Sequence, residues 1–259
     1  MFDITPIPAF ADNYIWLLKS SDSPEVAMVD PGDAMPVLDY LQREHLSLGA
    51  ILITHHHHDH TGGINRLKNA FPNARVYGPA HESIPEITDP LAEGAEVKLP
   101  WQSGSLKVFD VPGHTAGHIA YAGDNLLFCG DTLFAGGCGR VFDGTMEQMA
   151  TSLQRIAQLP GETLLYCAHE YTQDNLGFAH WVEPENQALQ ERQNATQTLR
   201  NQGTPTVPSL LSLELETNPF LRTQIPTVVA AAEKWAKTPL NNHAAVFTAL
   251  RTWKDRDYD

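Results

Sequence analysis

The chain has 259 residues, of which 31 are acidic and 17 are basic, so its formal net charge is −14. A surface this acidic repels phosphate backbones, which argues against a nucleic-acid-binding protein. The composition, with 42% hydrophobic and 19% charged residues, is sufficient for a packed core and excludes a disordered chain.

Short apolar runs alternate with helical patterns through the first two-thirds of the chain. The apolar runs predict strands over residues 14–19, 25–30, 50–54, 75–77, 106–111, 119–122, 126–129 and 164–168. Apolar residues at helical spacing predict helices over residues 33–45, 61–71 and 145–159. The last of these helices is expected to begin with a capping box formed by Thr145 and Gln148.

The pattern changes after Glu170, where we expect no further strands. Helical spacing there predicts helices over residues 185–200, 227–236 and 241–253. A proline-punctuated connection over residues 203–226 separates the first of these helices from the other two. The sequence therefore predicts an α/β domain over residues 1–169 and a small all-α domain over residues 170–259.

A histidine run directly follows the predicted buried strand over residues 50–54. The run comprises His55, His56, His57, His58, Asp59 and His60. Because side chains alternate in an extended segment, His55 and His57 point to one side and can bind one metal ion. The last two residues of the run, Asp59 and His60, lie where the chain turns toward a helix. They can therefore reach a second ion.

Three further candidate ligands each follow a predicted strand, where α/β sheets commonly carry their functional residues. They are His114, Asp131 and His169. His114 completes a three-histidine set with the first pair of the run, and His169 completes a second set with Asp59 and His60. Asp131 has two carboxylate oxygens and can bridge the two ions. The sequence thus predicts two metal sites that share one carboxylate.

These motifs resemble those of the metallo-β-lactamase superfamily, whose T-H-x-H-x-D-H signature matches residues 54–60. The chain is more similar still to the hydroxyacylglutathione hydrolase (glyoxalase II) family, in DNY near the start, VDPGD, PGHTAGH, GDTLFAGGCGR, AHEYT and a basic C-terminal helix. The resemblance implies an αββα sandwich followed by a small helical domain. It also implies an enzyme that cleaves S-(2-hydroxyacyl)glutathione, such as S-lactoylglutathione, to glutathione and D-lactate, the second step of methylglyoxal detoxification.

The resemblance also assigns the metal ligands. It implies two divalent metal ions, zinc first and otherwise iron or manganese. It gives the first ion to His55, His57 and His114, the second to Asp59, His60 and His169, and the bridge to Asp131. A hydroxide held between the ions would attack the thioester, because a bound metal lowers the pKa of water to about 7. Asp59 and Asp131 would be the catalytic carboxylates, and Asp30 would support the metal histidines.

The same resemblance implies a glutathione-binding set of basic and aromatic residues, namely Arg140, Phe142, Tyr171, Arg251 and Lys254. Arg251 and Lys254 are three residues apart and share a helix face. Local cations are needed here, because a protein of charge −14 repels an anionic thioester. Many members of the family have Lys-Phe-Tyr where this chain has Arg140-Val141-Phe142, so a tyrosine hydroxyl contact is missing.

Other functions stay open at this point. A glutathione persulfide dioxygenase, which uses one iron, or another hydrolase of the same fold would share the histidine motif. A metal-storage or metal-sensing protein could use the histidine run without Asp131 or His169. The role of His118 is open between support of the site and packing, and Cys138 is expected to be a buried structural thiol.

The sequence also bears on where the protein acts. The first residues lack the basic and apolar regions of a signal peptide, and no apolar run is long enough to span a membrane. We therefore expect a cytoplasmic monomer whose partner is a small-molecule glutathione thioester, without contact to membrane or nucleic acid.

Overall fold

The structure is a computed structural model that describes residues 3–20, 22–101 and 104–258. Contacts divide the chain into two compact units. The first comprises Met1–Asp110 and Thr115–Gly130, and the second comprises Val111–His114 and Asp131–Asp259. The segment from Asp131 to His169 thus groups with the C-terminal helices, whereas the domain boundary that we expect from the sequence lies after His169. That boundary stays a prediction.

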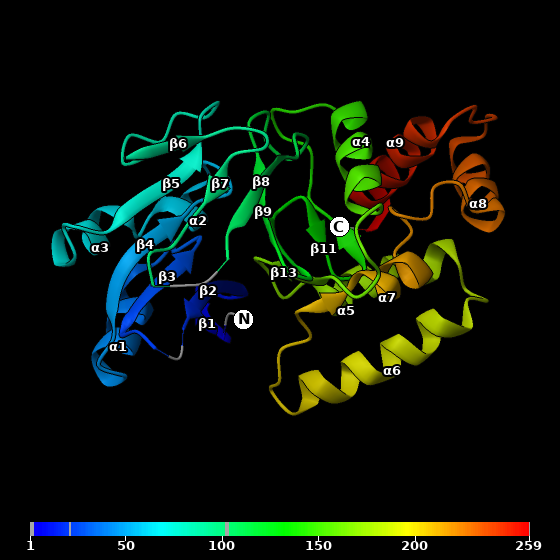
Figure 1. Cartoon of the computed structure of the whole chain (residues 1–259). Helices are drawn as coiled ribbons and strands as arrows, with labels where there is room; N and C mark the ends of the chain where they lie inside the picture. The colour runs from blue at the N-terminus through cyan, green and yellow to red at the C-terminus, as the bar shows by residue number, and fades with distance from the viewer. Residues whose placement is uncertain (1–2, 21, 102–103, 259) are drawn as a thin grey trace. The chain divides into compact units, whose positions relative to one another are not determined.

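The first unit contains a mixed sheet with the strand order β1 to β6. Its strands are β1 (Asp3–Ala9), β2 (Asn13–Lys19), β3 (Glu25–Val29), β4 (Ser47–Leu52), β5 (Arg75–Pro79) and β6 (Asp89–Leu91). Strands β1, β2 and β3 pair antiparallel, and β3 to β6 pair parallel. Helices α1 (Ala34–Arg43) and α3 (Ile64–Ala70) lie along this sheet (Figure 1) and share a buried apolar cluster with it.

A second sheet packs on the other face of the first within the same unit. It contains β7 (Glu96–Val97), β8 (Leu106–Asp110), β9 (Ile119–Gly123) and β10 (Leu126–Gly130), all antiparallel. The buried Tyr121 of β9 donates its hydroxyl to the carbonyl of Ile53, which follows β4, at 2.8 Å. Because both faces of the first sheet are covered, its central strands are continuous apolar runs rather than alternating ones.

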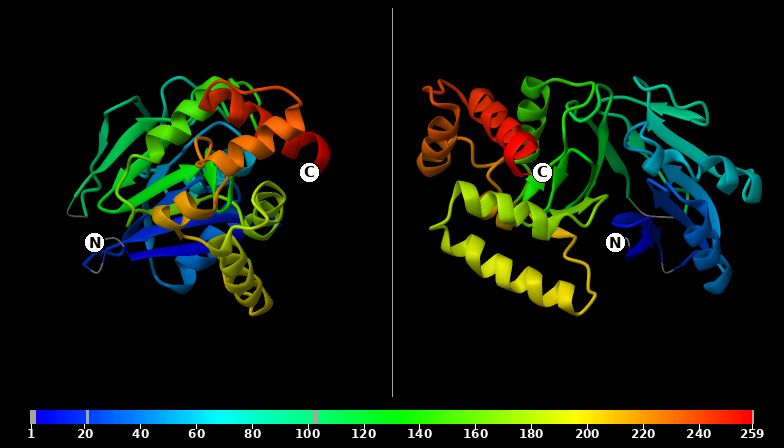
Figure 2. Two further views of the ribbon diagram at one scale, coloured as in Figure 1. Left: turned by 90° about the vertical axis from the view of Figure 1, so that its right-hand side faces the viewer. Right: turned by 180° about the vertical axis from the view of Figure 1, so that it is seen from behind.

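The second unit is mostly helical. Its helices are α4 (Met146–Ile156), α5 (Thr172–Val182), α6 (Gln187–Asn201), α7 (Leu211–Thr217), α8 (Pro226–Ala236) and α9 (His243–Trp253), followed by a π-helical turn, Lys254–Tyr258. Its short strands are β11 (Leu133–Phe134), β12 (Gly137–Cys138), β13 (Leu164–Cys167) and β14 (Ser209–Leu210). Helix α5 packs along α6, and α9 packs against α4 and α8 (Figure 2). No helix in the described part of the chain is long and apolar enough to cross a membrane.

The capping box of Thr145 and Gln148 is present at the start of α4, as predicted. Strand β1 was not predicted, because its prolines, Pro6 and Pro8, are disfavoured in most strands. It lies at the edge of its sheet, and prolines two residues apart direct their missing N–H groups to the same side, so the pairing with β2 is kept.

Our expectation of no strands after Glu170 and of a plain connection over residues 203–226 was wrong, because this region contains β14 and α7. Helix α5 was not predicted either, and it carries Gly177 in its interior. A Cβ at that glycine would lie 2.0 Å from the Tyr258 hydroxyl, so the close approach of the C-terminal turn explains the helix-weakening residue.

Candidate active site

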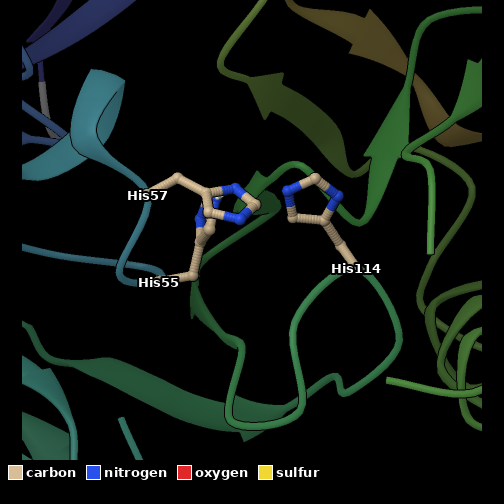
Figure 3. A group of neighbouring side chains, drawn as sticks. All are labelled: His55, His57 and His114. Atoms are coloured by element: carbon tan, nitrogen blue, oxygen red, sulfur yellow. Dashed lines mark hydrogen bonds between the residues drawn. The ribbon is translucent and has the colours of Figure 1, made fainter. Parts of the chain in front are cut away.

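The histidine run of the first unit lies between β4 and the short helix α2 (His58–Thr61). The rings of His55 and His57 lie edge to face with centroids 4.7 Å apart (Figure 3). His55 Nε2 is 3.0 Å from His57 Nδ1, so two ring nitrogens converge on one point that a proton or a cation can occupy. His56 instead meets the Glu82 carboxylate, with Nδ1 2.9 Å from Oε2.

Asp30 orients two of these histidines from the end of β3. Its carboxylate accepts the backbone N–H and the hydroxyl of Thr54, both at 2.8 Å, and its Oδ2 is 3.0 Å from His60 Nδ1. The Thr54 hydroxyl proton goes to Asp30, so the Thr54 oxygen accepts the Nδ1 proton of His55 at 3.0 Å. His55 Nε2 therefore keeps its lone pair, which is the state a metal ligand needs.

Asn13 and His118, for which no definite role was predicted, contact these residues. Asn13 donates its side-chain amide to Asp59 Oδ2 at 3.0 Å, and the same oxygen is 3.4 Å from His60 Nε2. His118 is fully buried and stacks on the ring of His55, with centroids 4.6 Å apart and an angle of 18° between the planes. Asn13 stands in the DNY motif, which was the available signal for it.

In the second unit Asp131 lies between two imidazoles. Its Oδ2 is 3.5 Å from His114 Nε2, and its Oδ1 is 3.4 Å from His169 Nε2. His114 Nδ1 is 2.8 Å from the backbone carbonyl of Arg140, which can only accept, so Nδ1 carries the proton and Nε2 keeps the lone pair. Asp131 thus presents one carboxylate oxygen to each imidazole.

The predicted metal ligands all belong to histidine and aspartate groups that could hold an ion. They are His55, His57, Asp59 and His60 in the first unit and His114, Asp131 and His169 in the second. The donors are imidazole nitrogens and carboxylate oxygens without a thiolate, a set that suits zinc, iron or manganese. The tautomers fixed by Thr54 and by the Arg140 carbonyl leave lone pairs available. These residues therefore fit a metal, and the clusters indicate metal binding.

A cavity of about 570 Å³ lies within the second unit, and Asp131 and His114 form part of its wall. The same wall contains each predicted glutathione-binding residue, that is Arg140, Phe142, Tyr171, Arg251 and Lys254. Its volume is in the range of small-molecule sites. The Phe142 ring is 63% exposed and lies edge-on to His114 at 5.2 Å, while Tyr171 stacks on His169 at 4.7 Å.

The cations of this wall do not form an open basic patch, because carboxylates balance them. Arg251 is 1% exposed and donates two hydrogen bonds to Asp255 Oδ1, at 3.1 and 2.8 Å. Lys254 donates to Asp174 Oδ2 at 3.1 Å. Arg140 is half exposed, and its Nε is 3.7 Å from Asp255 Oδ1. These aspartates could not be predicted from sequence patterns, because their pairing depends on tertiary packing.

The cysteines near the site are buried thiols. Burial raises the pKa of Cys138 to about 11 and that of Cys167 to about 12. Both side chains are thus protonated at neutral pH, and a protonated thiol is neither a nucleophile nor a metal ligand. The expectation that Cys138 is a buried thiol is confirmed.

Comparison with known proteins first defines the class. Residues 12–169 match the metallo-beta-lactamase superfamily. The B3 metallo-beta-lactamase BLEG-1 has a TM-score of 0.62 at 23% identity, covering 85% of this chain and 99% of that one, which is a likeness of fold. A protein solved in a di-iron-bound form is 28% identical, with a TM-score of 0.54 and coverage of 64% of this chain and 91% of that one. The predicted metallo-β-lactamase-like fold is confirmed.

The family within this class follows from the rest of the chain. Residues 170–257 match the family described as hydroxyacylglutathione hydrolase C-terminus. A hydroxyacylglutathione hydrolase of Alkalilimnicola ehrlichii is 54% identical over 256 residues, which is 99% of this chain and 100% of that relative. The chain belongs to the hydroxyacylglutathione hydrolase family.

Proposed function

We propose that this protein hydrolyses S-(2-hydroxyacyl)glutathione, S-lactoylglutathione first, to glutathione and a 2-hydroxy acid such as D-lactate. This reaction is the second step of methylglyoxal detoxification. The observation that carries the proposal is the cavity whose wall joins the metal-ligand candidates Asp131 and His114 to the cations Arg140, Arg251 and Lys254. A relative that is 54% identical over nearly the whole chain bears the name of this activity.

We propose that two metal ions bind, zinc in preference to iron or manganese. His55, His57 and His114 would hold the first ion, Asp59, His60 and His169 the second, and Asp131 would bridge them. The di-iron-bound structure at 28% identity supports a two-metal centre. When bound, the ions would supply hydroxide at neutral pH and stabilise the negative charge that develops on the thioester oxygen.

The chain's own residues would prepare this site. Asp30, through Thr54, keeps the lone pair of His55 Nε2 available, and it lies beside His60 Nδ1. Asn13 holds the carboxylate of Asp59, which we propose both binds a metal and accepts a proton during turnover. These contacts lower the reorganisation needed when the ions and the substrate bind.

The cavity wall would bind the glutathione part of the substrate. The carboxylates of glutathione would be attracted by Arg140, Arg251 and Lys254. They would replace some of the ion pairs that these cations now form with Asp174 and Asp255. Because one ion pair is exchanged for another, we expect moderate rather than very tight binding. Tyr171 and Phe142 would supply aromatic contacts, and Phe142 contributes no hydroxyl.

The protein would work alone on this small molecule. We propose a monomer in the cytoplasm that binds neither nucleic acid nor membrane, and the net charge of −14 supports the absence of nucleic acid. We also propose a catalytic domain over residues 1–169 and a substrate-binding domain over residues 170–259. The two family matches, over residues 12–169 and 170–257, support that division.

The test is hydrolysis of S-lactoylglutathione with metal analysis on the same preparation. We expect thioester cleavage and two divalent ions per chain. One iron per chain, no thioester cleavage and oxygen consumption with glutathione persulfide would instead identify a persulfide dioxygenase. Metal binding without turnover of either compound would identify a storage or sensing protein.

A further inference from the structure

The hairpin of β11 and β12 occupies a central place in the proposed reaction. It leads from Asp131 to Arg140, and it contributes Phe134 and Cys138 to the wall of the cavity. The Phe134 ring also lies edge-on to His169, with centroids 5.7 Å apart. The position of this hairpin therefore sets both the shape of the cavity and the surroundings of a metal-ligand candidate.

Two side chains of the helical region bind the hairpin backbone. Asn218 donates its side-chain amide to the carbonyl of Phe134 at 3.3 Å and to that of Gly137 at 2.9 Å. The N–H of Gly136 donates to Glu214 Oε2 at 2.8 Å. The Asn218 amide is also 3.1 Å from that oxygen, so the two side chains act as one unit.

The remaining hairpin peptides are held in the same way. Asn175 donates to the carbonyl of Ala135 at 3.2 Å, and Arg251 donates to that of Cys138 at 3.1 Å. Each residue from 134 to 138 thus has a backbone N–H or carbonyl that forms a hydrogen bond with a side chain. These side chains belong to α5, to α9, or to α7 and the residue that follows it. A Cβ on Gly137 would lie 2.4 Å from Asn175 Cγ, so the fit leaves no space for a larger residue.

Glu214 is itself fixed by a buried ion pair. Arg192 of α6 donates to Glu214 Oε1, to Thr217 Oγ1 at 2.6 Å and to Ser209 Oγ at 3.1 Å. The side chain of Glu214 is fully buried and that of Arg192 nearly so. Separating such a pair leaves an uncompensated buried charge, so the carboxylate is held in one orientation with Oε2 toward the hairpin.

Asn218 and Glu214 do not reach the substrate themselves. Both residues are 0% exposed, and neither is part of the cavity wall. Asn175 and Arg251, in contrast, line the cavity and can act on the substrate directly. An effect of Asn218 or Glu214 on substrate binding is therefore indirect, and the hairpin is the part of the cavity wall that both side chains contact.

We propose that Glu214 and Asn218 are positioning residues that hold the hairpin over residues 133–138 in the shape that binds the glutathione part of the substrate. The proposal rests on the proposed function. The helical region would then do more than supply binding side chains, because it also shapes the loop between the bridging aspartate and Arg140.

The test replaces Asn218 by serine, whose hydroxyl can still accept the N–H of Phe220 that Asn218 Oδ1 accepts at 3.1 Å. Serine does not reach the two hairpin carbonyls. We expect the KM for S-lactoylglutathione and the Kd for glutathione, measured by calorimetry, to rise about tenfold, with kcat within about threefold of wild type. A small thioester without a glutathione part should be hydrolysed as before.

Asn186→Ala is the matched control. Asn186 also joins two segments of this unit, because it donates to the carbonyl of Glu216 at 3.0 Å and accepts the N–H of Leu189 at 3.2 Å. Neither hydrogen bond involves a residue of the hairpin. We expect its KM and glutathione Kd to equal those of wild type. A tenfold rise in this control as well would assign the effect to general loosening of the helical region and overturn the proposal.

Hydrogen exchange on the wild-type protein tests the same idea without a variant. The Gly136 amide should exchange as slowly as the amides of α7, because its acceptor Glu214 is buried. Fast exchange at Gly136, or unchanged KM and Kd in Asn218→Ser, would overturn the proposal. Absence of thioester cleavage by wild type would contradict the proposed function, while the Gly136 exchange rate would still decide the positioning role.

Discussion

The two units hold their metal-ligand candidates by different means. In the first, the ligands come from one short stretch after β4, and side chains orient them, chiefly the carboxylate of Asp30. In the second, His114, Asp131 and His169 come from separate segments, and the orienting group of His114 is the backbone carbonyl of Arg140. A side-chain support can be removed by one substitution, whereas a backbone support depends on the path of the chain. Because of this difference, mutations can test the support of the ligand candidates in each unit separately.

The largest effect is expected at Asp131, the proposed bridging ligand. Asp131→Ala removes the carboxylate that lies between His114 and His169. We expect thioester hydrolysis to be lost and metal affinity to fall by more than the roughly 100-fold that loss of a supporting residue costs. Activity and metal analysis measure this, and circular dichroism checks that the fold is intact. Full activity would contradict a bridging role.

A smaller loss of metal affinity is expected from Asp30→Asn. The amide keeps one acceptor for Thr54 but places N–H groups where the hydroxyl of Thr54 and Nδ1 of His60 now face an oxygen. We expect metal affinity, measured by competition with a chelator, to fall about 10- to 100-fold.

Arg140→Ala is the counterpart in the second unit. It removes the half-exposed side chain but leaves the carbonyl that orients His114. Its metal affinity should stay at the wild-type level while the KM for the thioester rises. Equal loss of metal in the two variants would contradict the distinction between side-chain and backbone support.

Stability should show a second and milder contrast between the units, between a buried and a surface ion pair. In the second unit, burial alone would raise the pKa of Glu183, but hydrogen bonds from Arg222 and Thr227 hold it below its ordinary value of 4.5. A lowered native pKa means that this pairing stabilises the fold fully above pH 4.5 and progressively less as pH falls through the native pKa. We expect Glu183→Gln to lower the free energy of unfolding by about 2 kcal/mol near neutral pH.

Urea denaturation at neutral pH and well below pH 4.5 measures this effect, and the gap between Glu183→Gln and wild type should narrow in acid. The matched pair in the first unit is Asp89, whose pKa is lowered by a hydrogen bond from the exposed Arg75. Because this pair lies at the surface, Asp89→Asn should cost less than about 1 kcal/mol. A larger loss in Asp89→Asn than in Glu183→Gln would contradict the role given to burial.

How much the sequence predicted also differs between the units. The metal-ligand candidates of the first unit could be picked out because Thr54 to His60 form one local motif after an apolar strand. Asp131 was predictable because it ends a strand. Glu214 and Asn218 were not, since Glu214 lies within the unpredicted helix α7 and Asn218 directly follows it. Their hairpin partners lie about 80 residues earlier in the chain. The spacing of residues along the chain does not predict hydrogen bonds between such distant residues. They become evident only from the tertiary structure.

The smallest effect concerns the cysteines, which are buried in both units. With a pKa of about 11, Cys138 has a negligible thiolate fraction at neutral pH, so a thiol reagent should modify it only when the hairpin opens. In wild type we expect Cys138 and the first unit's Cys129 to be labelled slowly, and both to react once the chain is unfolded. Asn218→Ser should speed labelling of Cys138 but not of Cys129, because it loosens the hairpin and leaves the first unit unchanged. Mass spectrometry measures the labelling rate at each cysteine. An equal increase in the labelling rate of Cys129 would mean that the two units open together rather than independently.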